Sequence, residues 1–501
     1  MCAYHKTSRA RYPAIILPAM LIALTALLFL PSTGFSEALT LQDALQIALE
    51  NSPSIRQARN SLESAEASLN AEEASLKSQF RFDLTPFSLV KDRTVDAFTQ
   101  EWYTAETQSS AARFSVNQRL KWTDASLTLA NNFDWSKTSS ERENIGKFTR
   151  TTYRNSLSFG LSQPLFTYNR TRHTLSSLEL SYENSRINYA IQKLQIELRV
   201  TRAFYDVYQN RMSLNITQEE YRNKQESYDI IKNKVEAGIS AKEELFQAEI
   251  NQASSKAQLK NSQVSYEDAL DNLKILLGLS LHDEIEVLAD VGKFVVEVDL
   301  DKAVESGLQY RMELRQREIA IENARLSLVT VGAVDEFKGS VSLNYGLLGT
   351  EENLSDIYKS PLKSQSISVE FNIPIWDWGR KNSSLRASEL QLDNQVISRD
   401  EEQKQVELGI RQSYRSLQNQ LTQIEIAEKS IENARLTYEI NLERYKNGDI
   451  SSKDIGEFQN QLSREQYNHI AALINYRIAL LNLKIESLWD FENDRPVLDI
   501  G

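Results

Sequence analysis

The sequence carries YEDALDNLKI at residues 266–275 and YRIALLNLKI at residues 476–485, one pattern written twice at a distance of 210 positions. The correspondence continues upstream without a gap as far as Pro164 and Pro374. Internal repeats decide a fold before any single motif does, because each copy is one structural unit. We therefore expect a duplicated chain in which each unit runs helix, strands, long helix and helix.

A second correspondence, at a shift of 259 positions, places residues 41–69 on residues 300–328. Together the two matches divide the chain into a first repeat over residues 37–278, a linker over 279–299, a second repeat over 300–490 and a short tail over 491–501. Within each repeat the strands are expected between the helices. They should occupy about residues 80–165 in the first repeat and about 340–375 in the second.

Glycine and proline usage favours long helices over a string of globular domains. Only 16 of the 501 residues are glycine, about half of the average usage of about 7%. No proline occurs between Pro164 and Pro361, or between Pro374 and Pro496. Because proline breaks helix interiors, stretches this long without one permit very long helices.

The net charge of −12 argues against binding to nucleic acid or to anionic lipid surfaces.

The N-terminus, residues 1–36, reads as a secretory signal peptide. Lys6, Arg9 and Arg11 precede an apolar run over residues 14–30, and small residues follow before Glu37. The alternative is an N-terminal membrane anchor. The only cysteine, Cys2, lies before the apolar run, which leaves the mature chain without a disulfide, a lipidated N-terminal cysteine or a thiolate metal site. No other apolar run approaches the 18 to 20 residues of a membrane helix.

A heptad pattern runs through both repeats in the same register. The second repeat has Leu417, Ile424, Ile431, Tyr438 and Tyr445, and the first has Val207, Leu214, Tyr221, Tyr228 and Val235. Sustained heptads predict coiled-coil packing, and the alternative is an ordinary buried helix face. We expect long helices near residues 168–236 and 378–446, and shorter ones near 41–78, 240–278, 300–330 and 450–490. Gly238 and Gly448 follow the long helices and predict hairpin tips with a left-handed cap.

Between the helices the period changes from 3.5 to 2. Val341, Leu343, Tyr345 and Leu347 alternate with polar residues, and Leu157, Phe159 and Leu161 do the same in the first repeat. This pattern suits strands of a transmembrane barrel, with a soluble sandwich as the alternative. Two hairpins per chain cannot close a barrel, so several chains would contribute strands. The first repeat has surplus residues, in which 114–120 and 126–133 look like strands, either a further barrel hairpin or a loop outside the barrel.

Several of these stretches resemble the TolC-type outer-membrane efflux proteins. LQDALQIALENSP at residues 41–53 resembles the first helix of that family. QPLF at residues 163–166 and IPIW at residues 373–376 resemble its strand-to-helix junctions, which places Pro164 and Pro374 there. YKNG at residues 445–448, followed by DIGE at residues 454–457, is similar to its tip motif.

The resemblance implies a mainly helical fold with a twelve-stranded barrel formed by a homotrimer in the outer membrane, and a coiled-coil tunnel across the periplasm. It also implies docking to a periplasmic adaptor and an inner-membrane pump. Asp454 and Glu457 would then line the periplasmic aperture, beside the tip residues Gly238, Gly448 and Tyr445. The alternative for this acidic pair is a solvated helix start that favours the helix dipole. The basic residue with which some members latch closed is Ile450 here.

No constellation typical of an enzyme occurs in the sequence. The four histidines lack metal-type spacing, and no Walker loop, zinc-protease motif, nucleophile elbow or dinucleotide fingerprint is present. We therefore expect no catalytic residues, cofactor or metal. The sequence predicts a passive exit duct of a tripartite efflux or type I secretion system, surrounded by outer-membrane lipid. The alternative is a periplasmic coiled-coil adaptor or scaffold without a pore.

Overall fold

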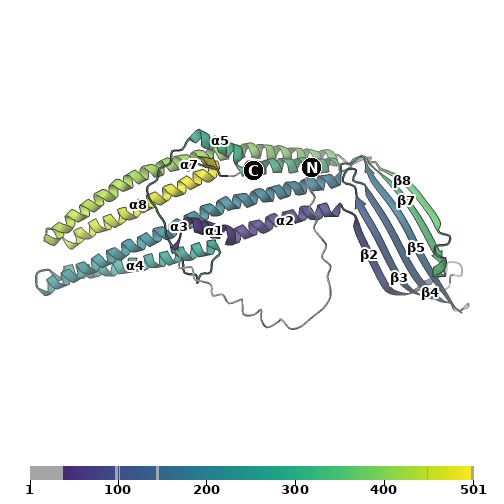
Figure 1. Ribbon diagram of the computed structural model, residues 1–501, viewed down its shortest axis with the longest axis horizontal. Helices are drawn as coiled ribbons and strands as arrows, with labels where there is room; N and C mark the ends of the chain where they lie inside the picture. Colours follow the sequence, from purple (N-terminus) through teal and green to yellow (C-terminus); the bar gives the residue numbers. More distant parts are fainter. Residues whose placement is uncertain (1–37, 96–99, 101, 143–145, 448, 498–501) are drawn as a thin grey trace, which may run out of the picture.

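The structure, a computed structural model, describes residues 38–95, 100, 102–142, 146–447 and 449–497. The molecule is elongated, with helices along its long axis and a tilted sheet of six strands at one end (Figure 1). Two helical hairpins form the opposite end. The predicted signal peptide and residues 498–501 lie outside the described residues.

Each repeat contributes the same set of four helices. The first repeat has α1 (Leu41–Asn51), α2 (Pro53–Ser75), α3 (Arg170–Glu236) and α4 (Lys242–Leu277), and the second has α5 (Leu300–Tyr310), α6 (Met312–Gly332), α7 (Arg380–Asn447) and α8 (Ser452–Ser487). The predicted long helices are confirmed: α3 has 67 residues and α7 has 68, which makes each about 100 Å long. Helices α2 and α4 pack one behind the other along α3.

Two helices that the sequence predicts as continuous are each broken once. The predicted helix near residues 41–78 breaks at Ser52, whose ψ of 130° leads into Pro53 as the first residue of α2. Proline has no N–H to donate and is tolerated at a first helical position. The predicted helix near residues 300–330 breaks at Arg311, with φ −62° and ψ 120°.

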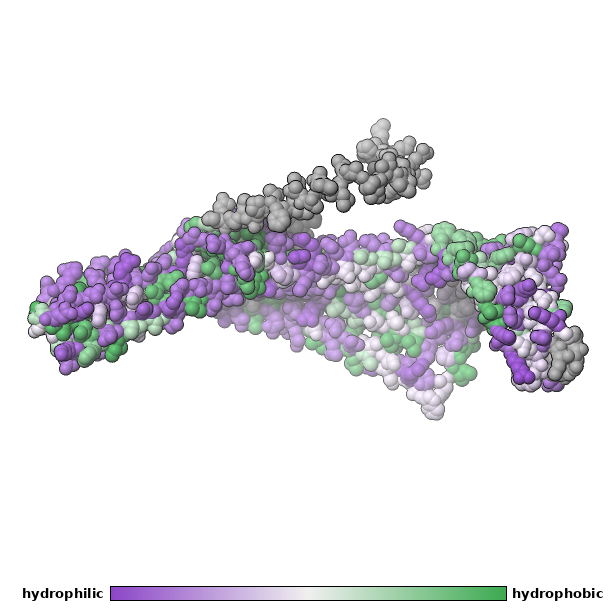
Figure 2. Space-filling model, turned by 90° about the horizontal axis from the view of Figure 1, so that it is seen from below, coloured by the Kyte–Doolittle hydropathy of each residue, from purple (hydrophilic) through white to green (hydrophobic). Residues whose placement is uncertain are grey.

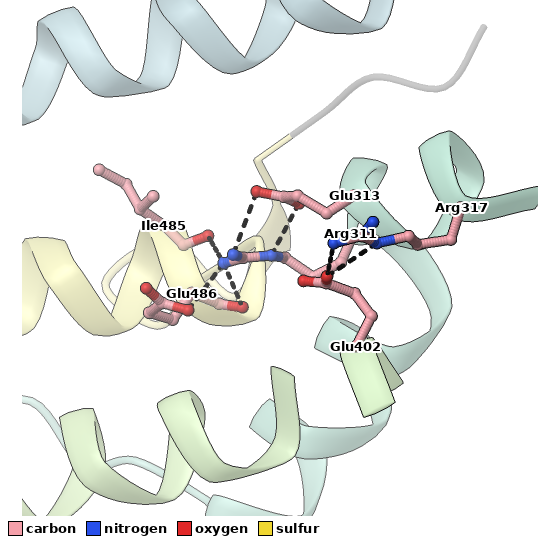
Figure 3. Close-up of polar contacts among 6 residues, drawn as sticks. All are labelled: Arg311, Glu313, Arg317, Glu402, Ile485 and Glu486. Atoms are coloured by element: carbon pink, nitrogen blue, oxygen red, sulfur yellow. Dashed lines mark hydrogen bonds and ion pairs between the residues drawn. The ribbon is translucent and has the colours of Figure 1, made fainter. Parts of the chain in front are cut away.

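An ion network explains the break at Arg311 (Figure 3). The Arg311 guanidinium donates to the carbonyl oxygens of Ile485 and Glu486 at 3.4 and 3.3 Å, and to the Glu486 carboxylate at 2.8 Å. It also donates to Glu313 at 3.1 Å. A cation at the carbonyl end of α8 is favourable for the helix dipole. Arg317 makes a separate pair with Glu402 at 2.9 Å, so this corner joins α6 to both α7 and α8.

The sheet is antiparallel throughout, in the order β2-β3-β4-β5-β7-β8. Its strands are β2 (Gln79–Val95), β3 (Trp102–Arg119), β4 (Ser126–Arg142), β5 (Gly146–Leu165), β7 (Lys338–Glu351) and β8 (Leu362–Asn372). The surplus residues of the first repeat therefore build a further hairpin of the same sheet. A twelve-stranded barrel of three chains needs four strands from each chain, whereas this sheet of the described residues has six.

The strands of the first repeat are 17 to 20 residues long. About 10 residues suffice to cross the hydrocarbon layer. The ends remote from the helices are polar, with Lys91, Asp92 and Arg93 near the end of β2 and Glu141 near the end of β4. These polar ends extend the sheet beyond its apolar part.

One face of the sheet is apolar across the strand pairs. Phe159 of β5 lies opposite Tyr345 of β7, and Leu343 of β7 lies opposite Ile367 of β8. On the other strands Phe82 faces Phe114 in the same way. The intervening positions are mostly serine, threonine, asparagine and charged residues. This alternation suits lipid on one side and water on the other.

The helices are held by two hydrophobic clusters near the middle of the molecule. The first centres on Ile196, Val200 and Phe204 of α3 and includes residues of α1 and α4. The second centres on Ile410 and Leu417 of α7 and includes residues of α5 and α8. The heptad positions Leu417 and Ile424 are buried, and Ile431, Tyr438 and Tyr445 are half-buried. Coiled-coil packing thus continues from these clusters towards the hairpin tips.

Candidate functional site

The first hairpin tip turns on a glycine in the left-handed region. Gly238 has φ +73° and follows the last residue of the α3 cap, Ala237. The N–H of Ile239 donates to the carbonyl of Lys234 at 2.8 Å, a bond that closes the end of the helix. A Cβ added at Gly238 would meet no atom within 4 Å, so the backbone conformation alone favours glycine there.

The second hairpin tip is closed by the corresponding hydrogen bond. The N–H of Asp449 donates to the carbonyl of Arg444 at 2.9 Å, and these two residues match Ile239 and Lys234 at the repeat distance of 210. Gly448, which the sequence places at this tip, lies outside the described residues. The closing bond is therefore common to both repeats, although the flanking side chains differ.

Asp454 begins α8 in a capping box with Ser451. Its Oδ2 accepts from the backbone N–H of Ser451 at 3.0 Å and from the hydroxyl at 2.7 Å, and its own N–H donates to the Ser451 hydroxyl at 3.3 Å. These bonds lower the pKa of Asp454 below its usual value, so the carboxylate stays ionised. Glu457 lies one turn further on the same helix face, and both side chains are exposed.

A cleft of about 230 Å³ lies between the two hairpins near their tips, lined by residues of α3 and α4 on one side and of α7 and α8 on the other. Lys224 of α3 reaches into it, and its Nζ would lie 2.9 Å from a Cβ added at Gly456 of α8. Burial lowers the pKa of Lys224, and the charge of Glu220 partly offsets this effect. The missing side chain at Gly456 thus gives room for a cation between the hairpins.

Tyr445 contacts the other hairpin. The Nζ of Lys234, near the end of α3, lies 5.9 Å from the centre of the Tyr445 ring. A cation over an aromatic face is attracted by the ring quadrupole. Lys224 and Lys234 had no sequence signal, because single lysines on long polar helices look like solvated surface. Only the packing of the two hairpins against each other brings Lys224 to the cleft and Lys234 to the ring of Tyr445.

The strand-to-helix junctions carry exposed aromatic residues. Hydrophobic residues gather on the surface where the helices meet the sheet (Figure 2). Pro164 lies within the last two residues of β5, and Pro374 lies between β8 and α7. Trp376 and Trp378 are 73% and 89% exposed, and Trp122 in the β3–β4 turn is 93% exposed. Exposed tryptophans at one level suit a membrane interface. No sequence pattern marks Trp122 as part of this group.

Two other features, a metal centre and a helix that could cross a membrane, are absent from the described part of the chain. No group of three or more histidine, cysteine, aspartate or glutamate side chains in it could hold a metal ion. None of the helices described in this structure is both long and apolar enough to cross a lipid bilayer.

Comparison with known sequences gives a family match. Residues 103–279 and 308–485 match the family described as "Outer membrane efflux protein", which is more than half of the chain. Among curated relatives, the outer membrane efflux protein BepC of Brucella suis is 23% identical over 347 residues, covering 67% of this chain and 74% of BepC. Nodulation protein T of Rhizobium leguminosarum is 20% identical, with coverages of 67% and 70%.

Solved structures share the fold. The CmeC outer membrane channel of Campylobacter jejuni matches with a TM-score of 0.67 and 17% identity, covering 89% of this chain and 85% of CmeC. The outer membrane protein VceC of Vibrio cholerae matches with a TM-score of 0.65 and 14% identity, covering 89% and 95%. The family is one of channels rather than enzymes, which favours the duct over an adaptor without a pore. The chain belongs to the outer membrane efflux protein family and is an outer-membrane exit duct of a tripartite efflux system, with its helical tunnel in the periplasm.

Proposed function

We propose that the entrance of this duct lies at the tips of the α3–α4 and α7–α8 hairpins, where Asp454 and Glu457 form a carboxylate ring. Channels of this family are trimers that work with adaptor and pump partners. A homotrimer of this chain would bring six carboxylates around one aperture. A ring of that kind attracts cations and repels anions.

The availability of both carboxylates is the observation that carries this proposal. Asp454 and Glu457 are exposed, and neither makes an ion pair with any residue that the structure describes. The capping box uses only Oδ2 of Asp454, so Oδ1 remains without a hydrogen bond to the described residues. Capping a helix and presenting a charge are therefore compatible for this side chain.

The test is ion selectivity in planar bilayers. The double variant Asp454→Asn, Glu457→Gln keeps side-chain shape and an acceptor for the capping box while it removes both charges. We expect its preference for cations over anions to fall and its block by multivalent cations to weaken. The matched control is Glu243→Gln, Glu244→Gln, which removes the same charge from the first turn of α4. Unchanged selectivity in the first variant would leave Asp454 and Glu457 as helix-start residues only.

For this chain we infer a homotrimer that docks a periplasmic adaptor at the hairpin tips and receives cargo from an inner-membrane pump. The support is the family match together with exposed apolar side chains at the first tip, namely Ile239, Phe246 and Ile250. Outer-membrane fractionation tests the assembly. We expect a heat-modifiable trimer in that fraction, and a soluble periplasmic monomer would contradict the proposal.

A further inference from the structure

The six-stranded sheet has two edges without a partner. All residues of β8 are exposed, as are all residues of β2 but one, and neither outer edge is paired with any described residue. Unpaired backbone N–H and C=O groups are intolerable in the hydrocarbon layer, so a wall in lipid must close on itself. The two edges of one copy run in opposite directions, β2 away from the helices and β8 back towards them.

We propose that three copies close an eighteen-stranded barrel, in which β8 of one copy pairs antiparallel with β2 of the next through residues 366–372 and 79–85. The inference rests on the trimer of the proposed function. Because each copy brings an even number of strands, every seam joins antiparallel neighbours. The occupant of each free edge is thus a second copy of this chain.

The two edges complement each other when their helix-proximal ends are level. Three apolar pairs then lie on the outer face and three polar pairs on the inner face: Phe80–Phe371, Phe82–Val369 and Leu84–Ile367 outside, and Arg81–Glu370, Asp83–Ser368 and Thr85–Ser366 inside. The faces follow from the pairing of each edge strand with its own neighbour. A slip of one residue would exchange the faces. A slip of two would separate the opposite charges of Arg81 and Glu370.

The observed register within one copy is compatible with this alignment. Paired residues lead from Gln79 across the sheet through Asn117, Thr128, Gly160 and Asn344 to Ser366, six residues short of the end of β8 at Asn372. If Gln79 of the next copy pairs with Asn372, the position level with Gln79 shifts by six residues along the strands for every six strands. The shear number of the closed barrel then equals its number of strands. A barrel whose shear equals its strand number has a strand tilt of about 36°, within the usual range for closed barrels.

The helices fit the same circumference. Beside the sheet they follow the order α2-α3-α6-α7, which parallels β2, β5, β7 and β8. Strands about 4.8 Å apart and tilted by about 36° take about 6 Å each, so six occupy about 36 Å of arc. Four helices packed about 9 Å apart also occupy about 36 Å. The seam between β8 and β2 therefore continues into a seam between α7 and α2.

The strand number sets the width of the outer pore. Eighteen strands at this tilt give a barrel about 34 Å across between opposite strands, whereas twelve would give about 23 Å. The additional hairpin of β3 and β4 widens the barrel while the tunnel keeps its helices. Arg113 on β3 and Asp134 on β4 share the polar face with Arg81 and line this wider lumen.

Disulfide trapping tests the seam. In a Cys2→Ser background, the pair Arg81→Cys, Glu370→Cys should give a covalent trimer on denaturing gels after mild oxidation of outer-membrane fractions. The pair Arg81→Cys, Ser368→Cys, displaced by two residues, should give at most a few per cent of it, and each single variant none. A pump-dependent dye-efflux assay and a heat-modifiable trimer verify the duct itself. Equal trapping in both pairs, or none in a variant that still assembles and exports, would overturn the seam but not the proposed function.

Cysteine labelling tests the additional hairpin. Thr128 and Leu129 are adjacent on β4 and point to opposite faces of the sheet. In a barrel wall, Thr128→Cys should react with a water-soluble maleimide and Leu129→Cys only with a lipophilic one, with at least a tenfold difference in rate ratio. The matched reference pair, Gly160→Cys and Leu161→Cys, reports the same contrast for β5. If both β4 positions react equally with the water-soluble reagent while the reference pair differs, the hairpin lies outside the wall and the barrel has fewer strands.

Discussion

The carboxylate of Asp124 binds Thr171 twice, accepting from its backbone N–H at 3.1 Å and from its hydroxyl at 2.6 Å. Asp124 occupies the turn between β3 and β4 with φ +61°, and Thr171 is a buried residue in the first turn of α3. The contact ties the additional hairpin to the helix that follows β5. It explains why this turn lies level with the strand-to-helix junctions.

Asp124→Ala should destabilise this junction by about 1 kcal/mol, because two N–H groups at the start of α3 lose their acceptor. Asp124→Asn retains an acceptor oxygen, and asparagine tolerates the left-handed conformation. This variant should therefore lose clearly less stability than Asp124→Ala. Thermal denaturation of the two variants in detergent measures the difference. Equal losses would mean that the carboxylate does not cap α3.

Arg311→Ala should destabilise the protein by about 3–5 kcal/mol, because it leaves Glu313, Glu486 and two carbonyls of α8 without their cation in a mostly buried site. Arg317→Ala is the matched control: its pair with Glu402 is more exposed and should contribute about 0–1 kcal/mol. Chemical denaturation of both variants shows which of them loses more stability. A smaller effect for Arg311→Ala than for Arg317→Ala would contradict the role of the cluster.

Gly238→Val should disturb the first tip and little else. A β-branched residue forced to φ +73° is strained by about 1–2 kcal/mol or more, and no neighbouring atom adds a clash. Gly238→Asn, which tolerates this conformation, should behave like the wild type. Hydrogen exchange at residues 234–244 should therefore accelerate in the valine variant only, with an unchanged melting temperature. A uniform loss of protection along α3 would argue against a local effect.

Glu197→Gln should change how stability depends on pH. Burial raises the pKa of Glu197; the charge of Lys484 lowers it by less, and the charge of Asp490 raises it further. The folded state therefore holds this proton more tightly than the unfolded state, so its stabilising contribution is complete below the unfolded pKa of 4.5 and is lost as pH rises through the raised value. Glutamine removes the penalty of a buried charge at neutral pH.

We accordingly expect the stability of Glu197→Gln, relative to that of the wild type, to rise between pH 4 and pH 7. Melting temperatures at both pH values measure this, with Glu73→Gln, an exposed residue on α2, as the control. A constant difference between Glu197→Gln and the wild type across this range would show that Glu197 titrates normally.

The repeat pattern predicted most of the helical architecture because it is local and periodic. Leu417 and Ile424 are buried at the heptad positions, and both long helices end within two residues of the expected bounds. The break at Arg311 was missed because its cause lies in contacts with Glu486, 175 positions away. No local pattern marks an arginine that caps a distant helix.

The sequence predicts only part of the additional hairpin, because only part of it has a clear local pattern. Residues 114–120 and 126–133 alternate clearly, whereas residues 104–111 consist of small and polar residues whose alternation cannot be read. At the tips, the resemblance to family motifs predicts Asp454, Glu457 and Tyr445 as site residues. It offered nothing for Lys224 or Lys234, whose surroundings depend on how the hairpins pack.

The β3–β4 hairpin also bears on how such a duct changes size over evolutionary time. Its turn lies at the level of the helices, so the hairpin adds two strands to the sheet and reverses the direction of none of the others. A single added strand would have reversed the direction of every later strand and placed the following helix on the wrong side of the membrane. Two strands are the smallest step that preserves the direction of the rest. Growth by hairpins lets the outer opening widen without redesign of the inner machinery.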